Sequence, residues 1–445
     1  MITASIGRSF VRHYNQKNNL NLSAKEFFEK FFYDLFFNHP KYLYWVSNSP
    51  FVQMGKGQKP HLLTAQERLE KLEKLHEKIE AGLIDASTAI GFPASETKEF
   101  ATTSGQVTDL MIQTDPDEVY CSWIGGGLGV GVAGGQTILF DNPAIFDALF
   151  QGWQVYRDYL NDPAYEGLSG NKINSWNSQW LTHVLGKDYR PGDPLRDFTG
   201  MSTNVDGSID IPTQSWLSVV LAIASKIQSP NMMGYVYKHG QTNSTYGFIL
   251  FDLMTIKRPS ELYTKLFGEF AYRRDAKIIE NLYGSAYSFQ RICQSGSVGT
   301  TALEPKGLKD YMEGKKKFKY DDTNSEIKIT FNTYVTWLLA MLNNDKFWDE
   351  TGEVADMLYR YGTYTSKEKD LSTGKSTQID SLLKTVNKPK FITELDSIMK
   401  AADASFSDEL EALAYKVHKI PVDHFLYFKT LVSLRYHKAV KKAEN

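Results

Sequence analysis

The hydrophobic pattern at the start of the chain predicts helices. Apolar residues recur at helical spacing over residues 27–36, and Ser23 with Glu26 forms a capping box directly before them. A second helix is expected over residues 64–81, where leucines form one stripe while Glu and Lys alternate on the other face. Such a charged face is typical of a solvated helix with i,i+4 ion pairs.

Between residues 100 and 140 the pattern changes, because Thr, Gly, Val and Ile dominate. Short strands are expected at 107–113 and 119–124. The glycine-rich stretch 125–135 follows. Residues 142–143, an Asn-Pro pair, then open an amphipathic helix, since proline is favourable at the first helical position.

The middle of the chain alternates between loop, helix and strand signals. Residues 167–197 are polar and predicted as loop, and residues 214–227 as a buried helix. Strand and turn patterns occupy 229–255, with glycines between them, and a further helix is expected at 260–281.

The last third of the chain is predicted to be helical. Residues 304–325 are rich in Gly, Lys and Asp, which suggests a domain boundary. The predicted fold class is therefore α+β: a mixed α/β domain with short strands and long helices over residues 1–325, then a C-terminal helical bundle over 326–445. Its expected helices are 333–343, 352–361, 378–385, 391–402, 407–418 and 422–442.

Composition narrows the class of protein. The hydrophobic fraction is 42% and the charged fraction 23%, values typical of globular chains. Lys plus Arg number 50 and Asp plus Glu 52, for a net charge of −2, whereas a free-standing nucleic-acid binder usually carries a basic excess. Any nucleic-acid role must therefore depend on local basic patches or on neighbouring subunits.

Cysteine usage and hydropathy predict the compartment. Cys121 and Cys293 are far apart and form neither zinc spacing nor a disulfide framework, so a reducing, cytoplasmic compartment is expected. Residues 1–16 lack the apolar stretch of a signal peptide. The longest central apolar run, 216–224, is too short to span a bilayer, so no membrane partner is predicted.

The glycine-rich stretch allows three interpretations. Gly129, Gly131 and Gly134 fit G-x-G-x-x-G, but a dinucleotide site needs a helix directly after this motif. Here residues 136–140 are strand-like, and the helix starts only at Pro143. The alternatives are a hairpin or bulged edge, for which glycine supplies positive φ, and a loop that lets backbone approach a nucleic-acid groove.

No catalytic residue, metal site or cofactor is predicted. His418 and His424 are separated by Pro421, which is not a helical ligand pair. Cys293 near Arg291 has either a lowered pKa or, more commonly, the character of a small buried thiol. A G-x-S-x-G nucleophile elbow is absent from the sequence.

Amide side chains alternate with two tryptophans between residues 171 and 180. Amides can read base edges with two hydrogen bonds, and aromatic rings can stack or wedge between bases. The competing interpretation is a capped turn with two buried tryptophans. The DNA-binding candidates here are Asn171, Lys172, Asn174, Asn177 and Gln179, beside Trp176 and Trp180.

Basic side chains supply the remaining DNA-binding candidates. Lysines around Phe318 can neutralise phosphates, although charge runs are more often solvated linkers. The C-terminal helix has a basic face suited to a phosphate backbone or an acidic partner. The candidates are Lys315, Lys316, Lys317 and Lys319, then Arg273 and Arg274, and on the last helix Lys429, Arg435, Lys438, Lys441 and Lys442.

Four stretches together carry a family resemblance. They are 141–153 (DNPAIFDALFQGW), 170–180 (GNKINSWNSQW), 330–340 (TFNTYVTWLLA) and 427–435 (YFKTLVSLR). Through them the chain resembles the large subunit of the type I CRISPR effector complex, Cascade, and most of all its type I-B branch.

The resemblance implies a non-catalytic role in antiviral defence. The front domain would recognise the protospacer-adjacent motif in duplex DNA, and the chain would pack near the 5′ end of the guide RNA among the other Cascade subunits. The C-terminal bundle would resemble the small subunits, hold displaced DNA and help to recruit a helicase-nuclease. Guide pairing would read the target sequence. Some relatives carry a zinc site of paired cysteines, which Cys121 and Cys293 cannot build.

Two other functions compete with this expectation. One is an enzyme that holds a nucleotide or sugar phosphate on the glycine-rich loop 125–135. The other is a scaffold whose helical end binds protein and no nucleic acid.

Overall fold

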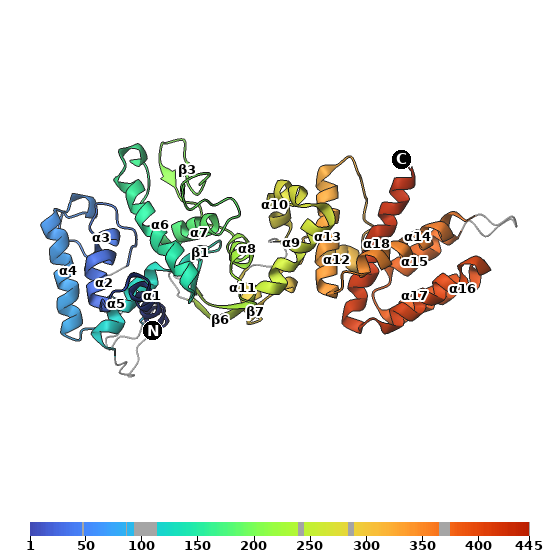
Figure 1. Ribbon diagram of the computed structural model, residues 1–445, viewed down its shortest axis with the longest axis horizontal. Coiled ribbons are helices and arrows are strands. Elements are labelled where there is room, and N and C mark those ends of the chain that lie inside the picture. Colours follow the sequence, from blue (N-terminus) through green and yellow to red (C-terminus); the bar gives the residue numbers. More distant parts are fainter. Residues whose placement is uncertain are drawn as a thin grey trace. The chain divides into compact units, whose positions relative to one another are not determined.

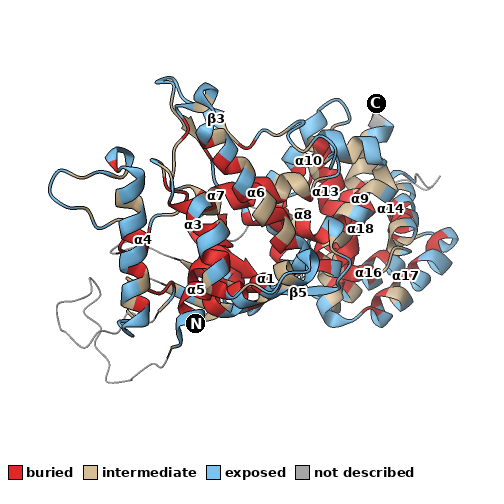
Figure 2. Cartoon of the chain, turned by 60° about the vertical axis from the view of Figure 1, so that its left-hand side comes forward, coloured by how far each residue is buried: buried red, intermediate tan, exposed pale blue. Residues whose placement is uncertain are grey.

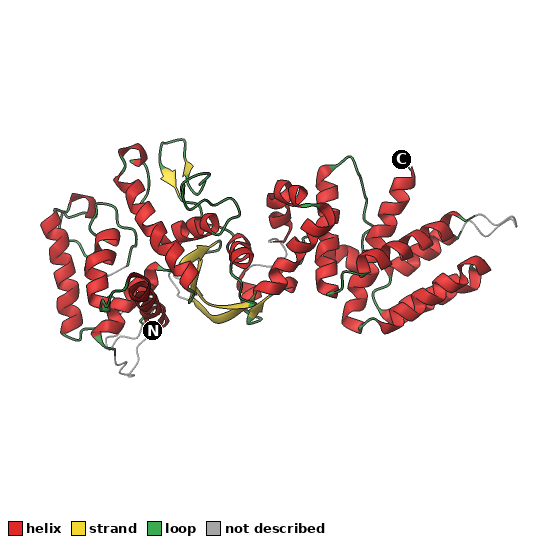
Figure 3. Ribbon diagram, in the orientation of Figure 1, coloured by secondary structure: helices red, strands yellow, loops and turns green. Residues whose placement is uncertain are grey.

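The computed structural model describes residues 1–46, 49–85, 87–92, 114–238, 244–283, 289–364 and 374–444. The chain divides into two compact units. Unit 1 comprises Met1–Leu253 with Phe289–Ser297, and unit 2 comprises Met254–Ser288 with Val298–Asn445. Helices occur throughout, a small sheet lies in the first part, and the C-terminal part is helical (Figures 1 and 3), so the predicted α+β class is confirmed.

Unit 1 contains the sheet. Its strand order is β1-β2-β5-β6-β7, and the β1–β2, β2–β5 and β5–β6 pairs are antiparallel. A second, two-stranded ribbon pairs β3 with β4. The strands are β1 (Val130–Val132), β2 (Gln136–Phe140), β3 (Ser202–Thr203), β4 (Ile209–Asp210), β5 (Asn231–Lys238), β6 (Ser244–Asp252) and β7 (Ser297–Val298). The strands expected within 229–255 are therefore confirmed.

Helices of unit 1 precede, connect and cover these strands. They are α1 (Ile2–Asn18), α2 (Ala24–Phe27), α3 (Tyr33–Phe36), α4 (Ala65–Glu80), α5 (Pro116–Gly127), α6 (Pro143–Asn161), α7 (Ile173–Val184), α8 (Trp216–Lys226) and α11 (Phe289–Cys293), with a π-helical turn, Phe28–Phe32, between α2 and α3. The Ser23–Glu26 capping box is present at α2. Much of α4 is exposed, as its charged pattern predicts (Figure 2).

Aromatic rings join the first helices to α6. Phe32 and Phe36 stack at 4.0 Å between ring centroids, and Phe36 meets Trp153 edge-on at 4.9 Å. Phe10 from α1 contacts Trp153 at 5.8 Å. Because each ring buries a large area, this cluster makes a substantial apolar core for unit 1.

The expectation of a strand at 119–124 is wrong, because these residues belong to α5. The Asp115 side chain accepts from the Glu118 amide, and Pro116 occupies the first turn, so a strong helix start precedes the β-prone residues. Val119 and Trp123 are fully buried, and tertiary packing overrides their strand propensity. The other expected strand, 107–113, lies outside the described residues.

The loop expected over 167–197 is also partly wrong. Residues Ile173–Val184 form α7, which turns several polar side chains into the protein. Their amides bond to backbone groups on other segments, so their polarity does not indicate exposure. A prediction that assumes polar residues to be exposed to solvent misses such a helix.

Helices α1 and α5 cross with their backbones in direct contact. A Cβ atom on Gly7 would lie 1.9 Å from the carbonyl oxygen of Cys121, and one on Gly125 would lie 1.9 Å from that of Thr3. No larger residue fits at either position. The crossing also brings the Met1 amino group to 2.8 Å from Glu118 Oε1.

Unit 2 is almost entirely helical. Its helices are α9 (Leu253–Phe267), α10 (Glu269–Tyr283), α12 (Leu308–Met312), α13 (Ser325–Leu342), α14 (Phe347–Thr363), α15 (Lys375–Lys384), α16 (Lys388–Ala401), α17 (Ser407–Lys419) and α18 (Val422–Glu444). The six helices predicted for the C-terminal region correspond to α13 through α18. Helix α18 packs against α13 and α14, and its Phe428 and Leu431 are fully buried.

The compact units divide at Leu253, whereas the sequence suggested a boundary at residue 325. The difference arises because α9, α10 and the segment after residue 298 pack on α13. Asn332 donates to the Tyr263 hydroxyl at 3.4 Å, and Trp337 Nε1 donates to the Thr300 carbonyl at 2.8 Å. The Gly- and Lys-rich segment therefore lies inside unit 2.

We expect Gly7→Ala to lower the free energy of unfolding by about 3 kcal/mol, the upper end of the cost of overpacking, because the atoms it meets are backbone. Urea unfolding followed by tryptophan fluorescence measures this. Gly192→Ala is the matched control, since a Cβ there meets nothing within 4 Å. Equal losses in the two variants would show that the crossing tolerates a side chain.

Candidate nucleic-acid interface

The amide segment on α7 is mainly structural. Asn177 is fully buried, and its Nδ2 donates to the carbonyls of Gly127 and Gly129 at 2.8 and 2.9 Å. Gln179 is 9% exposed, donates to the Pro212 carbonyl at 2.5 Å and accepts from Gln214. Side chains that are buried and bonded in this way cannot reach a base edge, so the prediction of base reading is wrong for Asn177 and Gln179.

Of the other three candidates in this segment, Asn171 and Lys172 remain accessible, whereas the side-chain oxygen of Asn174 is buried. Asn171 is exposed, but its side-chain oxygen accepts from the Trp45 amide at 2.8 Å. Lys172 pairs with Asp210 at 3.0 Å. Asn174 is half-buried, with a 3.5 Å hydrogen bond to Thr137. Trp176 and Trp180 are both fully buried, which confirms that part of the competing interpretation.

The glycine motif forms a hairpin. Gly129 and Gly131 lead into and through β1, and Gly134 has a φ of 93° in the turn to β2. The dinucleotide interpretation is therefore wrong, because no helix N-terminus follows the motif to receive a pyrophosphate. The hairpin interpretation is confirmed.

Close packing brings the glycine motif into contact with the amide segment on α7. A Cβ on Gly131 would lie 3.0 Å from backbone and side-chain atoms of Asn174, and one on Gly129 would lie 2.6 Å from Thr137 Cγ2. The glycines thus let α7 lie directly on β1, and Asn177 of α7 donates hydrogen bonds to the carbonyls of Gly127 and Gly129. The amide segment and the glycine motif form one structural joint in unit 1.

The two arginines on α10 are exposed but paired. Arg273 bonds Glu269 at 3.0 Å within the helix. Arg274 Nε donates to Asp275 at 2.7 Å, and this carboxylate is 3% exposed and also accepts from Tyr263. Arg274 therefore compensates a buried charge, while Arg273 is held only by a surface pair of small energy.

The lysine cluster borders a groove of about 610 Å³ in unit 2. Phe318 is buried and anchors the segment against Tyr311 and Phe331. We call this groove, lined by Tyr311, Lys316, Lys317, Phe318, Lys319, Glu326, Ile327 and Thr330, the basic groove.

Most lysines of the cluster have acidic neighbours. Lys315 pairs with Glu313, Lys316 with Asp310 and Lys317 with Asp380, all with partly exposed side chains. Lys319 is exposed and makes no ion pair within the described part of the chain. Exposed pairs contribute little to stability, so a phosphate can replace these partners at small cost.

The C-terminal helix brings one further candidate to this region. Lys438 Nζ lies 4.7 Å from the ring centroid of Phe331, the same ring that Phe318 contacts. Burial, followed by the charges of Lys442 and Arg435, lowers the pKa of Lys438 to about 8. The carboxylate of Asp322 acts in the opposite direction, and Lys328 adds a smaller repulsion that again lowers this pKa. Positive charge therefore accumulates beside the basic groove without full compensation.

Lys429 is internal and Arg435 is half-buried, which corrects the assignment of Lys429 to an exposed basic face. The Arg435 guanidinium lies 4.0 Å from the Trp348 ring centroid and donates to the Trp348 carbonyl. Lys429 is fully buried, and its Nζ donates to the Met312 carbonyl at 3.0 Å. Both side chains hold helices together, and the fully buried Lys429 cannot contact a phosphate backbone.

One exposed feature had no counterpart in the sequence prediction. On β5 and β6, Tyr235 and Phe248 pack at 5.2 Å between centroids, and Phe248 is 58% exposed beside exposed Met233. Accessible aromatic rings on a sheet can stack with bases. The alternation along 231–238 carried the signal, but only strand pairing shows which residues share a face.

Both cysteines behave as buried thiols. Burial raises the pKa of Cys121 to about 12, with a contribution from Asp117, and burial alone raises that of Cys293 to about 12. Neither thiolate is populated near neutral pH. Among the described residues, no group of three or more His, Cys, Asp or Glu side chains is placed to hold a metal ion.

Comparisons and hydropathy add two findings. No protein-family model, curated protein or solved structure matches this chain. No helix within the described ranges combines the length and apolar character that crossing a bilayer requires.

The buried Lys429 predicts a pH dependence of stability. Burial lowers the pKa of Lys429 to about 8, whereas an unfolded lysine keeps its proton until about pH 10.5. Between these values the unfolded state binds more protons, so stability rises with pH. From pH 7.5 to 9.5 we expect wild type to gain about 2 kcal/mol relative to Lys429→Met, measured by urea unfolding. The variant Lys390→Met, which changes an exposed lysine, should show the same gain in stability as wild type. If Lys429→Met also showed this gain, Lys429 would not be its source.

Proposed function

We propose that this chain is a non-catalytic, nucleic-acid-binding subunit of a cytoplasmic RNA-guided surveillance complex, similar to the large subunit of type I Cascade. In this role it recognises a protospacer-adjacent motif in duplex DNA and stabilises the opened target in antiviral defence. The basic groove carries the structural part of the proposal. The four sequence stretches described above carry the family part.

The basic groove suits a phosphate backbone. It offers Lys319 without an acidic partner, and three neighbouring lysines whose exposed ion pairs exchange readily. Lys438 lies beside it with a pKa lowered by burial and by nearby cations, so an anion bound there would relieve the repulsion. Phosphate contacts supply sequence-independent affinity.

The aromatic face of β5 and β6 supports a second kind of contact. Phe248 and Tyr235 offer ring surfaces that stack with any base. In unit 1, the segment around the start of α7 offers the accessible Asn171 and Lys172, beside the half-buried Asn174. Under the proposal these three remain the candidates for motif contacts, and guide pairing reads the remaining sequence.

The near-neutral charge of the chain is compatible with a subunit that binds DNA only within a larger complex. The net charge of −2 gives little long-range attraction for DNA, so strong binding requires guide RNA and the other subunits. Recruitment of a helicase-nuclease would then supply the catalytic step. The enzyme alternative is weakened because the glycine hairpin forms no phosphate cradle, and a protein scaffold remains the competing function.

The first test is co-purification. We expect the full chain, isolated from its native cells, to carry RNA of uniform length together with other proteins, because a guide-bound subunit is part of a ribonucleoprotein. Sequencing of the RNA should return a common 5′ segment followed by variable sequences. Isolation of the chain without RNA, or turnover of a small molecule by the chain alone, would refute the proposal.

The second test addresses the basic groove in that same complex. We expect Lys317→Gln with Lys319→Gln, two lysines that line the groove, to weaken binding of all duplexes equally and to reduce the slope of log affinity against log salt by about 2, since each phosphate contact contributes about 1. Fluorescence anisotropy over a salt series measures the slope.

The matched control is Lys346→Gln with Lys390→Gln, which removes two exposed charges of unit 2 elsewhere. An unchanged slope in the groove variant, or an equal change in the control, would remove the basic groove from the DNA path. A loss confined to one DNA motif would instead assign base reading to these lysines.

A further inference from the structure

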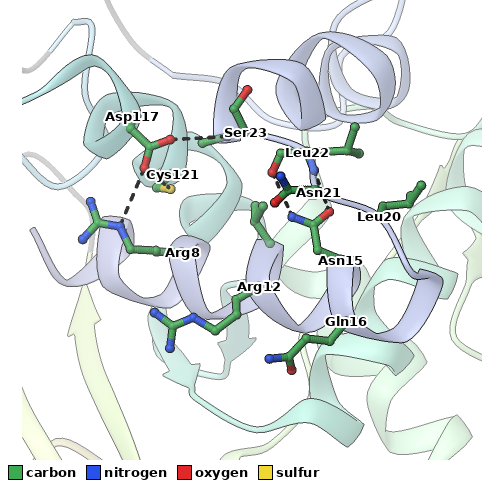
Figure 4. A pocket seen from close by; sticks show the side chains of 12 residues that line it. Arg8, Arg12, Asn15, Gln16, Leu20, Asn21, Leu22, Ser23, Asp117 and Cys121 are labelled. Atoms are coloured by element: carbon green, nitrogen blue, oxygen red, sulfur yellow. Dashed lines mark hydrogen bonds and ion pairs between the residues drawn. The ribbon is translucent and has the colours of Figure 1, made fainter.

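A second groove, in unit 1, has a different chemistry. It encloses about 380 Å³ between α1, the segment that leads into α2, and α5 (Figure 4). We call it the α1 groove. Its lining includes Arg8, Val11, Arg12, Leu20, Asp117 and Cys121.

The walls of the α1 groove are held rigidly. Asn15 bonds both backbone groups of Leu22, at 3.1 Å to the amide and 2.8 Å to the carbonyl, and Ala24 donates its amide to Asp117 at 3.3 Å. Asn19 turns the chain with a φ of 52° directly after α1. A groove that is already shaped loses little entropy when a ligand binds.

Two arginines stand one helical turn apart on α1 and remain available. Arg8 is 47% exposed and only 3.7 Å from Asp117, a long ion pair. Arg12 is exposed, and in the described part of the chain it makes neither a hydrogen bond nor an ion pair. Figure 4 shows its guanidinium without a bonded neighbour among the drawn side chains.

Apolar surface lies beside these charges. Val11, Ala24 and Cys121 are buried, whereas Leu20 is 45% exposed at one end. Arginine next to apolar surface is the composition typical of protein–protein contacts. A ligand with one carboxylate and one apolar side chain would satisfy both kinds of lining.

The surrounding charges disfavour a polyanion. Asp117 belongs to the groove itself, and two more carboxylates contact the neighbouring positions of α1: Asp141 bonds Ser9 at 3.1 Å, and Asp147 bonds His13 at 2.9 Å and Lys17 at 3.0 Å. A nucleic-acid backbone, with a charge at every nucleotide, would meet these carboxylates. A single carboxylate at Arg12 would not.

We propose that the α1 groove is a docking site for a protein partner, which inserts an acidic side chain against Arg12 and Arg8 and an apolar side chain against Leu20. This site needs no nucleic acid and is separate from the basic groove. The test of this docking site is therefore independent of the test of the proposed function.

The test uses the full chain and a defined probe. The probe is a panel of fluorescein-labelled ten-residue peptides, each with one Glu and two Leu at spacings of one to four residues in a Gly-Ser background. We expect anisotropy to detect binding of at least one spacing, with affinity reduced about tenfold by Glu→Gln in the peptide or by Arg12→Gln in the protein, because a charge-assisted hydrogen bond is lost.

Arg190→Gln is the control, since it removes another exposed arginine of unit 1 and should leave binding unchanged. Single-stranded dT10 and inorganic phosphate are the competing probes. No binding by any peptide, equal binding by Arg12→Gln and wild type, or displacement of the peptide by dT10 at lower concentration than by unlabelled peptide would overturn the proposal.

Discussion

Close approach of helices to the segment from Gly125 to Gly131 is the constraint on which unit 1 depends. On one side α1 touches the backbone at Gly125, and on the other α7 lies on β1 at Gly131. Asn177 then pairs two carbonyls that α5 and β1 leave open between them. Because only glycine leaves room for these contacts, the α1 groove and the α7 surface of unit 1 depend on them for their positions.

The polar segment on α7 and the lysine segment 315–319 use their polar side chains in opposite ways. In unit 1, amides of α7 point inward and replace backbone partners, so a polar stretch supports the core. In unit 2, lysines of residues 315–319 remain outside while Phe318 holds their segment down. This contrast explains how a chain of almost zero net charge can present a local basic groove, and why charge totals alone say little about binding.

Prediction from sequence succeeded where the signal was local. Capping at Ser23 and the helices of the C-terminal third depend on neighbours within a few turns, and both are present in the structure. It failed at α5, where Val119 and Trp123 favour strand. It also failed at Asn177 and Gln179, whose burial depends on segments distant in the chain. The α1 groove was missed because α5, which supplies Asp117 and Cys121 to its lining, lies more than a hundred residues after Arg8 and Arg12 in the sequence.

By itself the sequence determined the α+β class, the presence of the six C-terminal helices and that of a lysine cluster, because periodicity, caps and composition can be recognised within short segments. Only the tertiary structure decided which polar side chains face solvent, which lysines have acidic partners, and that the glycine motif is a hairpin under α7. The physical reason is that burial and ion pairing are properties of contacts between remote segments. The sequence pattern of a single segment therefore cannot reveal which of its side chains are buried or paired.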